Sequence, residues 1–385
     1  MSSDLRRVAL SLFIWGLGEG TFLYIQPLYI RSLGASPAQI GAVLGIASVG
    51  TVLFHVPAGY LGDRLGRRPV MLAGWWLGLL AALVMYFAPS LSLFTVGITL
   101  YFSTAFVTPV FNSYVASSRG ALSMERAITA VAAIYGAGAV ASPALGGLIA
   151  AHFGLRTVYG VASLLFVLST AVLMPISPQA PSNTRGPYLG GSLALNRDFL
   201  RLLVLVLTAG LAMYISIPLA PNFLQRVHAV PVETIGLLGS ANALGLVVFN
   251  SLLGTHHPRR GWILAQGMLL SSCLLLWLGT GLPFYLLGYF LRAGFGVARS
   301  LSTSLVGRVV EGNGMGLAFG LSETVNAVAM VTAPIVAGLL FESQPSLPFQ
   351  VSTVLVALTM LLTWGLAPAS GHGSSLPIPE PRLPG

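Results

Sequence analysis

The sequence is poor in charge and cysteine and has no lysine. Charged residues make up only 8% of its 385 residues, whereas soluble domains carry about 25%. So few charged side chains cannot cover a water-facing surface, which excludes a soluble globular domain. The single cysteine, Cys273, has no partner within the chain, so an intrachain disulfide is excluded as well.

The 19 basic residues are all arginine and give a formal net charge of +9. In a soluble chain this balance would suggest a nucleic-acid partner. Here the arginines cluster in short segments between long apolar runs, which is the pattern that sets topology in a membrane protein. We therefore expect no nucleic-acid partner.

The sequence also lacks the motifs of common enzymes. It contains no H-E-x-x-H zinc motif, no G-x-S-x-G nucleophile motif, no phosphate-binding G-x-x-x-x-G-K and no cluster of Cys and His. The His256-His257 pair lies beside two arginines and no carboxylate, which favours charge anchoring over metal binding. We expect neither an enzyme nor a cofactor or metal.

Long apolar runs fill the rest of the chain. Apolar residues make up 55% of the sequence, and the mean hydropathy is +0.84. A helix needs about 20 apolar residues to cross a bilayer, whereas a barrel strand needs about 10 in strict alternation. The runs lie at 8–30, 39–61, 70–88, 91–117, 125–151, 156–176, 199–222, 233–254, 262–280, 282–306, 314–341 and 348–369. Their lengths predict an all-α integral membrane protein with twelve transmembrane helices in the lipid bilayer.

The longest polar connection, residues 177–198, divides these spans into six and six. It separates a first six-helix bundle (1–176) from a second one (199–369), and a proline-rich tail (370–385) is predicted to be disordered. The first apolar run is too long for the core of a signal peptide, so we expect it to be retained as a span.

The placement of the arginines predicts the orientation. With the N-terminus in the cytoplasm, fourteen arginines fall inside and only Arg31, Arg156 and Arg226 fall outside. Arginine-rich loops stay on the cytoplasmic side of a membrane. Both termini are therefore predicted to be cytoplasmic, and a bacterial cytoplasmic membrane is the expected location.

The two halves repeat each other. A shift of about 191 residues brings small residues and prolines of the first half onto the same residue types in the second. The aligned pairs include Pro143 with Pro334, Gly147 with Gly338 and, at a shift of 195, Gly41 with Gly236. Two related bundles suit a carrier that rocks around a central site.

The loop after the second run combines glycines, an acid and arginines. Its key positions are Gly59, Gly62, Asp63, Arg64, Gly66, Arg67 and Arg68. Spaced glycines let a neighbouring helix approach closely, the acid can meet a helix N-terminus or an arginine, and the arginines hold the segment at an anionic membrane surface. A simple basic anchor would need neither the acid nor the glycines.

This loop resembles the signature cytoplasmic loop of the major facilitator superfamily and matches it at every defining position. The resemblance implies two six-helix bundles, a monomeric carrier and a latch in which Asp63 lies against the start of span 11, near 314–316. The second half keeps only a degenerate copy at 254–261, without the acid. We predict that Asp63→Asn impairs transport and leaves substrate affinity nearly intact.

A run of small residues in the fifth span resembles the antiporter motif of the same family. The matching positions are Gly138, Pro143, Gly146 and Gly147, and Ser142 replaces the first glycine of a Gly-Pro pair. Generic close packing of helices is the alternative interpretation. Drug-exporting members also carry a basic residue in span 4, where this chain has Tyr101.

Three ionisable residues lie near mid-span, namely Glu19, Arg292 and Glu323. Such groups are costly in hydrocarbon and mark partners or pathways. Similar depth predicts an Arg292–Glu323 pair, either functional or only a packing element, while Arg299 is expected to reach the inner surface. Glu19 has no basic residue at matching depth in its half, so we expect it to be the main proton-coupling residue.

Eight polar or aromatic residues are candidates for the substrate cavity. They are Tyr24, Gln26, Tyr101, Asn112, Tyr135, Tyr214, Asn242 and Asn326. Tyrosines also occur at membrane interfaces, so each is a weak signal alone. Together they predict an amphipathic, partly aromatic cavity for a small-molecule substrate.

The leading hypothesis is a secondary active exporter of small amphipathic compounds, driven by proton antiport. One alternative is proton-coupled uptake or facilitated transport of a sugar or an organic anion, which Arg292 and Arg299 in one cavity would favour. Another, from a different class, is a non-transporting membrane receptor on a carrier fold. The direction of substrate movement under an imposed pH gradient separates the first two.

Overall fold

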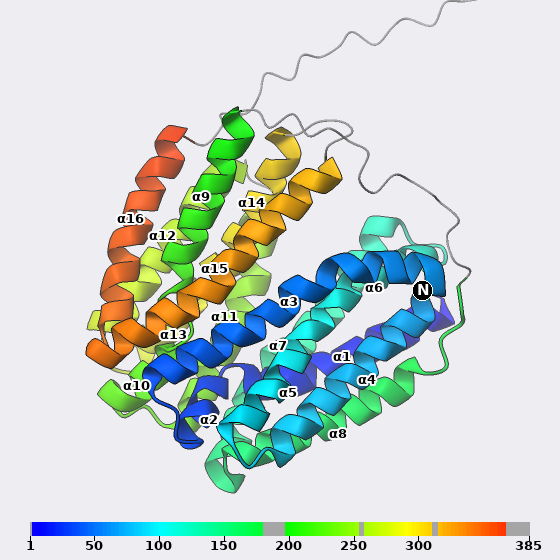
Figure 1. Ribbon diagram of the computed structural model, residues 1–385, viewed down its shortest axis with the longest axis horizontal. Helices are drawn as coiled ribbons and strands as arrows, with labels where there is room; N and C mark the ends of the chain where they lie inside the picture. The colour runs from blue at the N-terminus through cyan, green and yellow to red at the C-terminus, as the bar shows by residue number, and fades with distance from the viewer. Residues whose placement is uncertain (1, 180–196, 254–257, 310–314, 367–385) are drawn as a thin grey trace, which may run out of the picture.

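The chain is helical almost throughout in the computed structural model, which describes residues 2–179, 197–253, 258–309 and 315–366 (Figure 1). The helices before the linker are α1 (Ser3–Leu23), α2 (Gln26–Ser32), α3 (Pro37–Leu65), α4 (Arg67–Phe87), α5 (Leu91–Ser103), the short 3-10 helix η1 (Thr104–Phe106), α6 (Val107–Ser117), α7 (Met124–Phe153) and α8 (Leu155–Leu173). The helices after it are α9 (Arg197–Tyr214), α10 (Ala220–His228), α11 (Val232–Leu253), α12 (Pro258–Leu278), α13 (Leu282–Arg292), α14 (Gly294–Val309), α15 (Met315–Ser343) and α16 (Leu347–Leu366).

Each predicted span corresponds to one of these helices or to consecutive ones. By length and hydropathy, seven described helices can cross a membrane, or eight if α1 and α2 form one span bent by 48°. These criteria support the all-α membrane fold and confirm the count of twelve only in part. Large apolar side chains also face outward, among them Phe153 (73% exposed) and Trp364 (71%). Such a surface suits lipid rather than water.

Local sequence signals set where the helices begin and end. The first helix begins at Ser3 rather than at residue 8, because the Ser2 hydroxyl accepts a hydrogen bond from the Leu5 amide and caps the helix. Ser36 and Gln39 form a capping box at the start of α3. Gly66 separates α3 from α4 with a φ of +85°, a conformation that favours glycine.

The interruptions within the spans repeat between the two halves. The chain breaks after Leu23, between α1 and α2, and again 191 residues later after Tyr214, between α9 and α10. It also breaks after Ser103 in the fourth span and after Arg292 in the tenth, 189 residues later. The spacing matches the shift found in the sequence, so the repeat extends to the shape of the helices.

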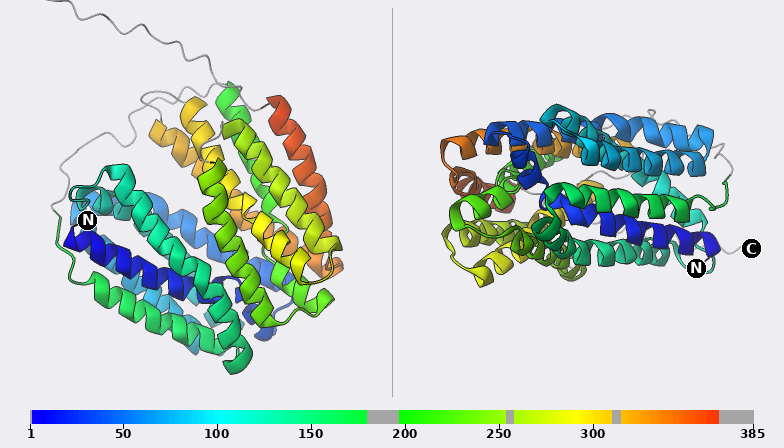
Figure 2. Two further views of the ribbon diagram at one scale, coloured as in Figure 1. Left: turned by 180° about the vertical axis from the view of Figure 1, so that it is seen from behind. Right: turned by 90° about the horizontal axis from the view of Figure 1, so that it is seen from below.

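Helices α1–α8 and α9–α16 form two sets that meet at one end (Figures 1 and 2). The contacts between the sets join α3 to α15, α7 to α11, and α2 to α10. From there the two sets spread apart towards the points where α8 ends and α9 begins. We call the end where they meet the closed end and the other the linker end.

Candidate functional site

A cavity of about 400 Å³ lies mainly within the first half, beside α1, and six aromatic side chains form part of its wall. Its lining includes Trp15, Glu19, Trp75, Tyr101, Phe102, Phe111, Tyr135 and, from the second half, Met330. Trp15 stacks on Phe166 with a centroid distance of 4.2 Å and tilts against Trp75 at 5.2 Å. We call this space the aromatic cavity.

Glu19 is the acidic group of the aromatic cavity. Its Oε2 accepts a hydrogen bond of 2.6 Å from the Tyr135 hydroxyl, and Tyr101 interacts with the same carboxyl. None of the ion pairs among the described residues includes Glu19. The structure therefore brings together three residues singled out in the sequence, and the partners of the carboxyl are neutral.

The sequence interpretation missed the tryptophans of this cavity. Leu12, Trp15, Glu19 and Leu23 all line it and follow one another along α1 at intervals of three or four residues. Residues at this spacing share a helix face. The periodicity around Glu19 could therefore have indicated Trp15, whereas Trp75 of α4 had no comparable signal.

A second cavity, of about 210 Å³, lies between the two halves and shares Leu23 and Phe102 with the aromatic cavity. Five predicted residues line it, namely Tyr24, Gln26, Tyr214, Asn242 and Arg292. We call it the arginine cavity. The Tyr24 hydroxyl donates a hydrogen bond of 2.9 Å to Asn242 Oδ1 across the two halves.

The predicted pair of Arg292 with Glu323 is wrong. Glu323 Oε2 instead lies 2.7 Å from Arg299 Nη2. Arg292 is the last residue of α13, whereas Arg299 lies two helical turns further on, in α14, and reaches Glu323 on α15. Arg299, which was expected to reach the inner surface of the membrane, binds Glu323 in the structure.

Two of the predicted cavity residues lie apart from the two cavities. Asn112 is exposed on α6 and lines none of the cavities found among the described residues. Asn326 is only 8% exposed and borders a small space of about 20 Å³ beside Arg299. Their polar character marked them in the sequence, but their helix faces turn them away from the aromatic and arginine cavities.

The closed end is built from two copies of one contact. A Cβ on Gly236 of α11 would lie 2.4 Å from the Pro143 carbonyl oxygen and 2.7 Å from the Gly147 Cα of α7. A Cβ on Gly41 of α3 would lie 2.1 Å from the carbonyl oxygen of Pro334 and 3.1 Å from the Cα of Gly338, both on α15. The residues that the repeat aligns therefore form two equivalent contacts, one between α7 and α11 and one between α3 and α15.

The antiporter-like run of α7 faces two neighbours. Pro143 and Gly147 face α11 of the other half, whereas Gly138 and Gly146 face α1 within their own half. A Cβ on Gly146 would lie 1.9 Å from the Thr21 carbonyl oxygen, so α1 and α7 pack backbone against backbone. The run thus connects the helix that carries Glu19 to the contact at the closed end.

The signature loop lies at the linker end. Gly59, Gly62, Asp63 and Arg64 belong to the last two turns of α3, and Gly66 forms the turn that follows. Arg67 Nη1 donates hydrogen bonds to the Ser113 carbonyl, to Ser117 Oγ and to Gln179 Oε1, at 2.9 to 3.3 Å. The expected contact of Asp63 with residues 314–316 lies outside the described residues and side chains.

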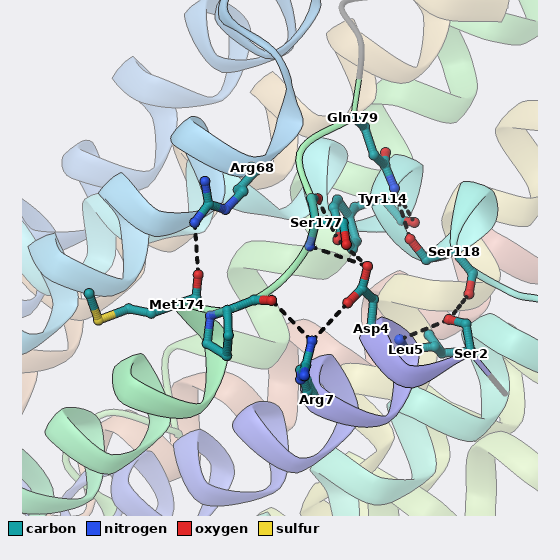
Figure 3. Close-up of polar contacts among 11 residues, drawn as sticks. Ser2, Asp4, Leu5, Arg7, Arg68, Tyr114, Ser118, Met174, Ser177 and Gln179 are labelled. Atoms are coloured by element: carbon teal, nitrogen blue, oxygen red, sulfur yellow. Dashed lines mark hydrogen bonds and ion pairs between the residues drawn. The ribbon is translucent and has the colours of Figure 1, made fainter.

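Polar contacts at the same end hold the start of the linker against the first half (Figure 3). Arg68 Nη2 donates a hydrogen bond of 2.9 Å to the Met174 carbonyl. Asp4 accepts one from the Ser177 amide at 3.2 Å, and the Tyr114 hydroxyl donates one to the Ser177 carbonyl at 2.9 Å. The described part of the linker therefore belongs structurally to the first bundle.

Two repeated helical bundles, with one cavity beside α1 and another between the halves, are the architecture of a membrane transporter. The sequence matches the Major Facilitator Superfamily over residues 8–201 and 202–384, and the chain belongs to this family. This confirms the family that the signature loop indicated.

Relatives and solved structures resemble the chain over its whole length or over part of it. It is 23% identical over 379 residues to Multidrug resistance protein 1 of Bacillus subtilis (strain 168), covering 92% of this chain and 93% of the relative. It is 34% identical over 148 residues to the class G tetracycline resistance protein of Vibrio anguillarum, covering 36% and 37%. The crystal structure of nucleoside transporter NupG superposes with a TM-score of 0.77 at 14% identity, covering 94% of this chain and 98% of that one.

Proposed function

We propose that this chain is a secondary active transporter that exports small amphipathic compounds in exchange for protons. It works in a bacterial cytoplasmic membrane with both termini in the cytoplasm, and it binds its substrate as a monomer. The observation that carries the proposal is the Glu19 carboxyl in the wall of the aromatic cavity, hydrogen-bonded to Tyr135 at 2.6 Å.

The lining of the aromatic cavity supports an amphipathic substrate. Trp15, Trp75 and Phe111 offer flat apolar surfaces, and Glu19 offers the acidic group. Binding pockets for small molecules combine an apolar wall with a few polar groups that fix orientation. An ionisable residue inside a membrane protein is by default a candidate for a proton pathway.

The arrangement of the halves supports an inward-facing state. The contacts that join the halves lie at the closed end, which the arginine distribution places outside the cell, and the linker end lies inside. Substrate enters from the linker end, the halves rock, and Glu19 takes up a proton when the cavity faces outward. Arg292 and Glu323 supply polar groups in the second half, and Gly59 to Arg68 form the gating loop.

The relatives favour export over uptake. The names of the B. subtilis and V. anguillarum proteins refer to resistance against drugs, and the match to the first covers nearly the whole chain. The nucleoside transporter contributes the fold alone, because its identity is only 14%.

The test uses purified protein in liposomes with an imposed pH gradient. The probes are ethidium as a cation, N-phenyl-1-naphthylamine as a neutral compound and dansylglycine as an acid. We expect at least one probe to move against its gradient towards the acidic side, with release of protons on the other side. We expect Glu19→Gln to bind that probe and to lose proton release.

Two outcomes would contradict the proposal. Probe movement in the same direction as the protons would identify an importer instead. Proton release from Glu19→Gln equal to that of the unmodified protein would remove Glu19 from the coupling mechanism. Tyr159→Phe serves as control, because the Tyr159 hydroxyl lies buried without a described hydrogen-bond partner.

A further inference from the structure

The arginine cavity contains two hydrogen-bond donors that have no acceptor. Arg292 Nη1 and Gln26 Nε2 are both buried, and neither has a hydrogen-bond partner among the described residues. Both residues line the same space of about 210 Å³. Buried polar groups in native proteins are nearly always paired, so unpaired donors facing a cavity call for an explanation.

The charge of Arg292 is also unbalanced. Its guanidinium carbon lies 4.9 Å from the ring centroid of Tyr289 and 6.0 Å from that of Tyr24, so aromatic rings are its neighbours. The three described ion pairs join Arg7 to Asp4, Arg201 to Asp198 and Arg299 to Glu323, and Arg292 takes part in none of them. A buried cation normally has a counter-ion, because desolvation of an unpaired charge is costly.

The nearby carboxylates are already engaged. Glu323 is held by Arg299 at 2.7 Å, and Glu19 is held by Tyr135 at 2.6 Å in the aromatic cavity. Two other polar groups of the arginine cavity bind each other or the backbone, since Tyr24 donates to Asn242 and Asn242 donates to the Tyr289 carbonyl. What the cavity lacks is an acceptor with negative charge.

The shape of a guanidinium specifies the acceptor further. Its planar fork of N–H groups matches a carboxylate or another planar oxyanion, and the pairing is often bidentate. The Gln26 amide Nε2 adds a further unpaired donor in the same cavity. These donors therefore fit one acidic group. Among the described residues, no carboxylate lines the arginine cavity, so it has no group that would hold a cation.

The two cavities adjoin each other, with Leu23 and Phe102 in the wall of both. Their volumes of about 400 and 210 Å³ together reach the range of drug-sized sites, about 300–1,000 Å³. An apolar or aromatic body fills the aromatic cavity, and a short arm crosses Leu23 and Phe102 to the arginine cavity.

We propose that Arg292 and Gln26 bind the acidic group of the transported compound, which is an amphipathic organic acid with an aromatic or apolar body. This inference rests on the proposed function for its assignment of the cavity to transport. It narrows the substrate class from amphipathic compounds in general to those that carry a carboxylate or a similar oxyanion.

The test measures binding to the purified full-length protein in detergent. The probes are ω-phenylalkanoates with two to six carbons in the chain, each paired with its neutral primary amide of the same shape. Calorimetry gives the affinities, and quenching of tryptophan fluorescence reports whether the phenyl group reaches Trp15 and Trp75. We expect the best acid to bind at least tenfold more tightly than its amide.

Variants then assign that preference to a residue. Arg292→Gln is expected to remove the preference for the acid, and Arg292→Lys to keep part of it, because lysine retains the charge but not the fork. Arg156→Gln is the matched control, since Arg156 also lies over a tyrosine ring, that of Tyr86 at 5.7 Å, yet outside both cavities. It should keep the full preference.

Three results would overturn the inference. They are equal binding of acids and amides to the unmodified protein, failure of every acid to bind at millimolar concentration, and an acid preference that survives in Arg292→Gln. The first two need no variant, so a folding defect in Arg292→Gln does not weaken the test. Binding is measured without a pH gradient, so failure of proton coupling in liposomes would contradict the proposed function and leave this result standing.

Discussion

Gly236 of α11 lies so close to Gly147 of α7 that a Cβ on Gly236 would be 2.7 Å from the Gly147 Cα. That separation is below any ordinary contact, and the nearest atoms are backbone, which cannot rotate away. The two halves of the transporter meet at this point and at its repeat between Gly41 and Gly338. The contact has no room for a single added methyl group.

We therefore predict that Gly236→Ala opens the closed end. Overpacking costs about 1–3 kcal/mol, and a coupling of this size shifts an equilibrium by about 5- to 150-fold. The reporter is Asn222→Cys in a Cys273→Ser background, because Asn222 is buried at the closed end and donates a hydrogen bond to the Pro27 carbonyl of the other half. Its labelling by a maleimide should become at least fivefold faster.

The control for this experiment is Gly320→Ala. Gly320 lies on α15, where a Cβ would meet no heavy atom within 4 Å. In Gly320→Ala, the Asn222→Cys reporter should be labelled at the same rate as in the protein without that substitution. Equal rates for Gly236→Ala and Gly320→Ala would mean that the glycine contact does not hold the closed end.

A second prediction concerns the hydroxyl that binds Glu19. Tyr135→Phe removes the 2.6 Å hydrogen bond and keeps the ring. Hydrogen bonds to charged groups contribute about 1.5–3 kcal/mol, so we expect the rate of proton-coupled probe transport to fall about tenfold or more. Tyr159→Phe, which removes a buried hydroxyl without a described partner, should transport normally. A normal rate in both variants would show that Tyr135 does not position the carboxyl.

The Arg299–Glu323 pair should add little to stability. Both side chains are partly exposed, 39% and 44%, and exposed ion pairs contribute about 0–1 kcal/mol. A double-mutant cycle with Arg299→Gln and Glu323→Gln, read by thermal unfolding in detergent, should give a coupling energy below about 1 kcal/mol. The exposed Arg201–Asp198 pair provides the comparison. A coupling several times larger would show that the pair is desolvated in the membrane.

Arg67 should matter more for stability than its position at a helix end suggests. It donates to the Ser113 carbonyl, to Ser117 and to Gln179, and so joins α4 to α6 and to the start of the linker. Loss of partners for such groups costs about 1–3 kcal/mol, so Arg67→Gln should lower the melting temperature by a few degrees. Arg201→Gln, which removes a single exposed ion pair, should not. Equal melting temperatures would show that water replaces all three contacts.

The sequence was sufficient for the helices and for the family. Runs of about 20 apolar residues have one stable form in a bilayer, because every backbone group must be paired within the segment. The run predicted at 125–151 is α7, Met124–Phe153, and the one at 233–254 is α11, Val232–Leu253. The signature loop gave the family, and the family match covers both halves.

The pairing of side chains could not be predicted in the same way. By residue count Arg292 and Glu323 both lie near mid-span, but such a count does not decide between two arginines that lie two turns apart. In the structure the Glu323 carboxylate pairs with Arg299 and not with Arg292. The sequence indicated only part of the lining of the aromatic cavity. Trp75 comes from α4 and meets Trp15 through tertiary packing, which no local pattern shows.

Backbone atoms make the closest approaches in the contact at the closed end. Glycine Cα atoms and proline carbonyls form both of its copies, and each described ion pair lies within one half of the chain. Closure there depends on shape, so ionic strength should leave it unchanged, whereas a gate made of salt bridges would weaken in salt. A chain that keeps this backbone contact is free to change the walls of its two cavities, and so its cargo, without altering how the closed end forms.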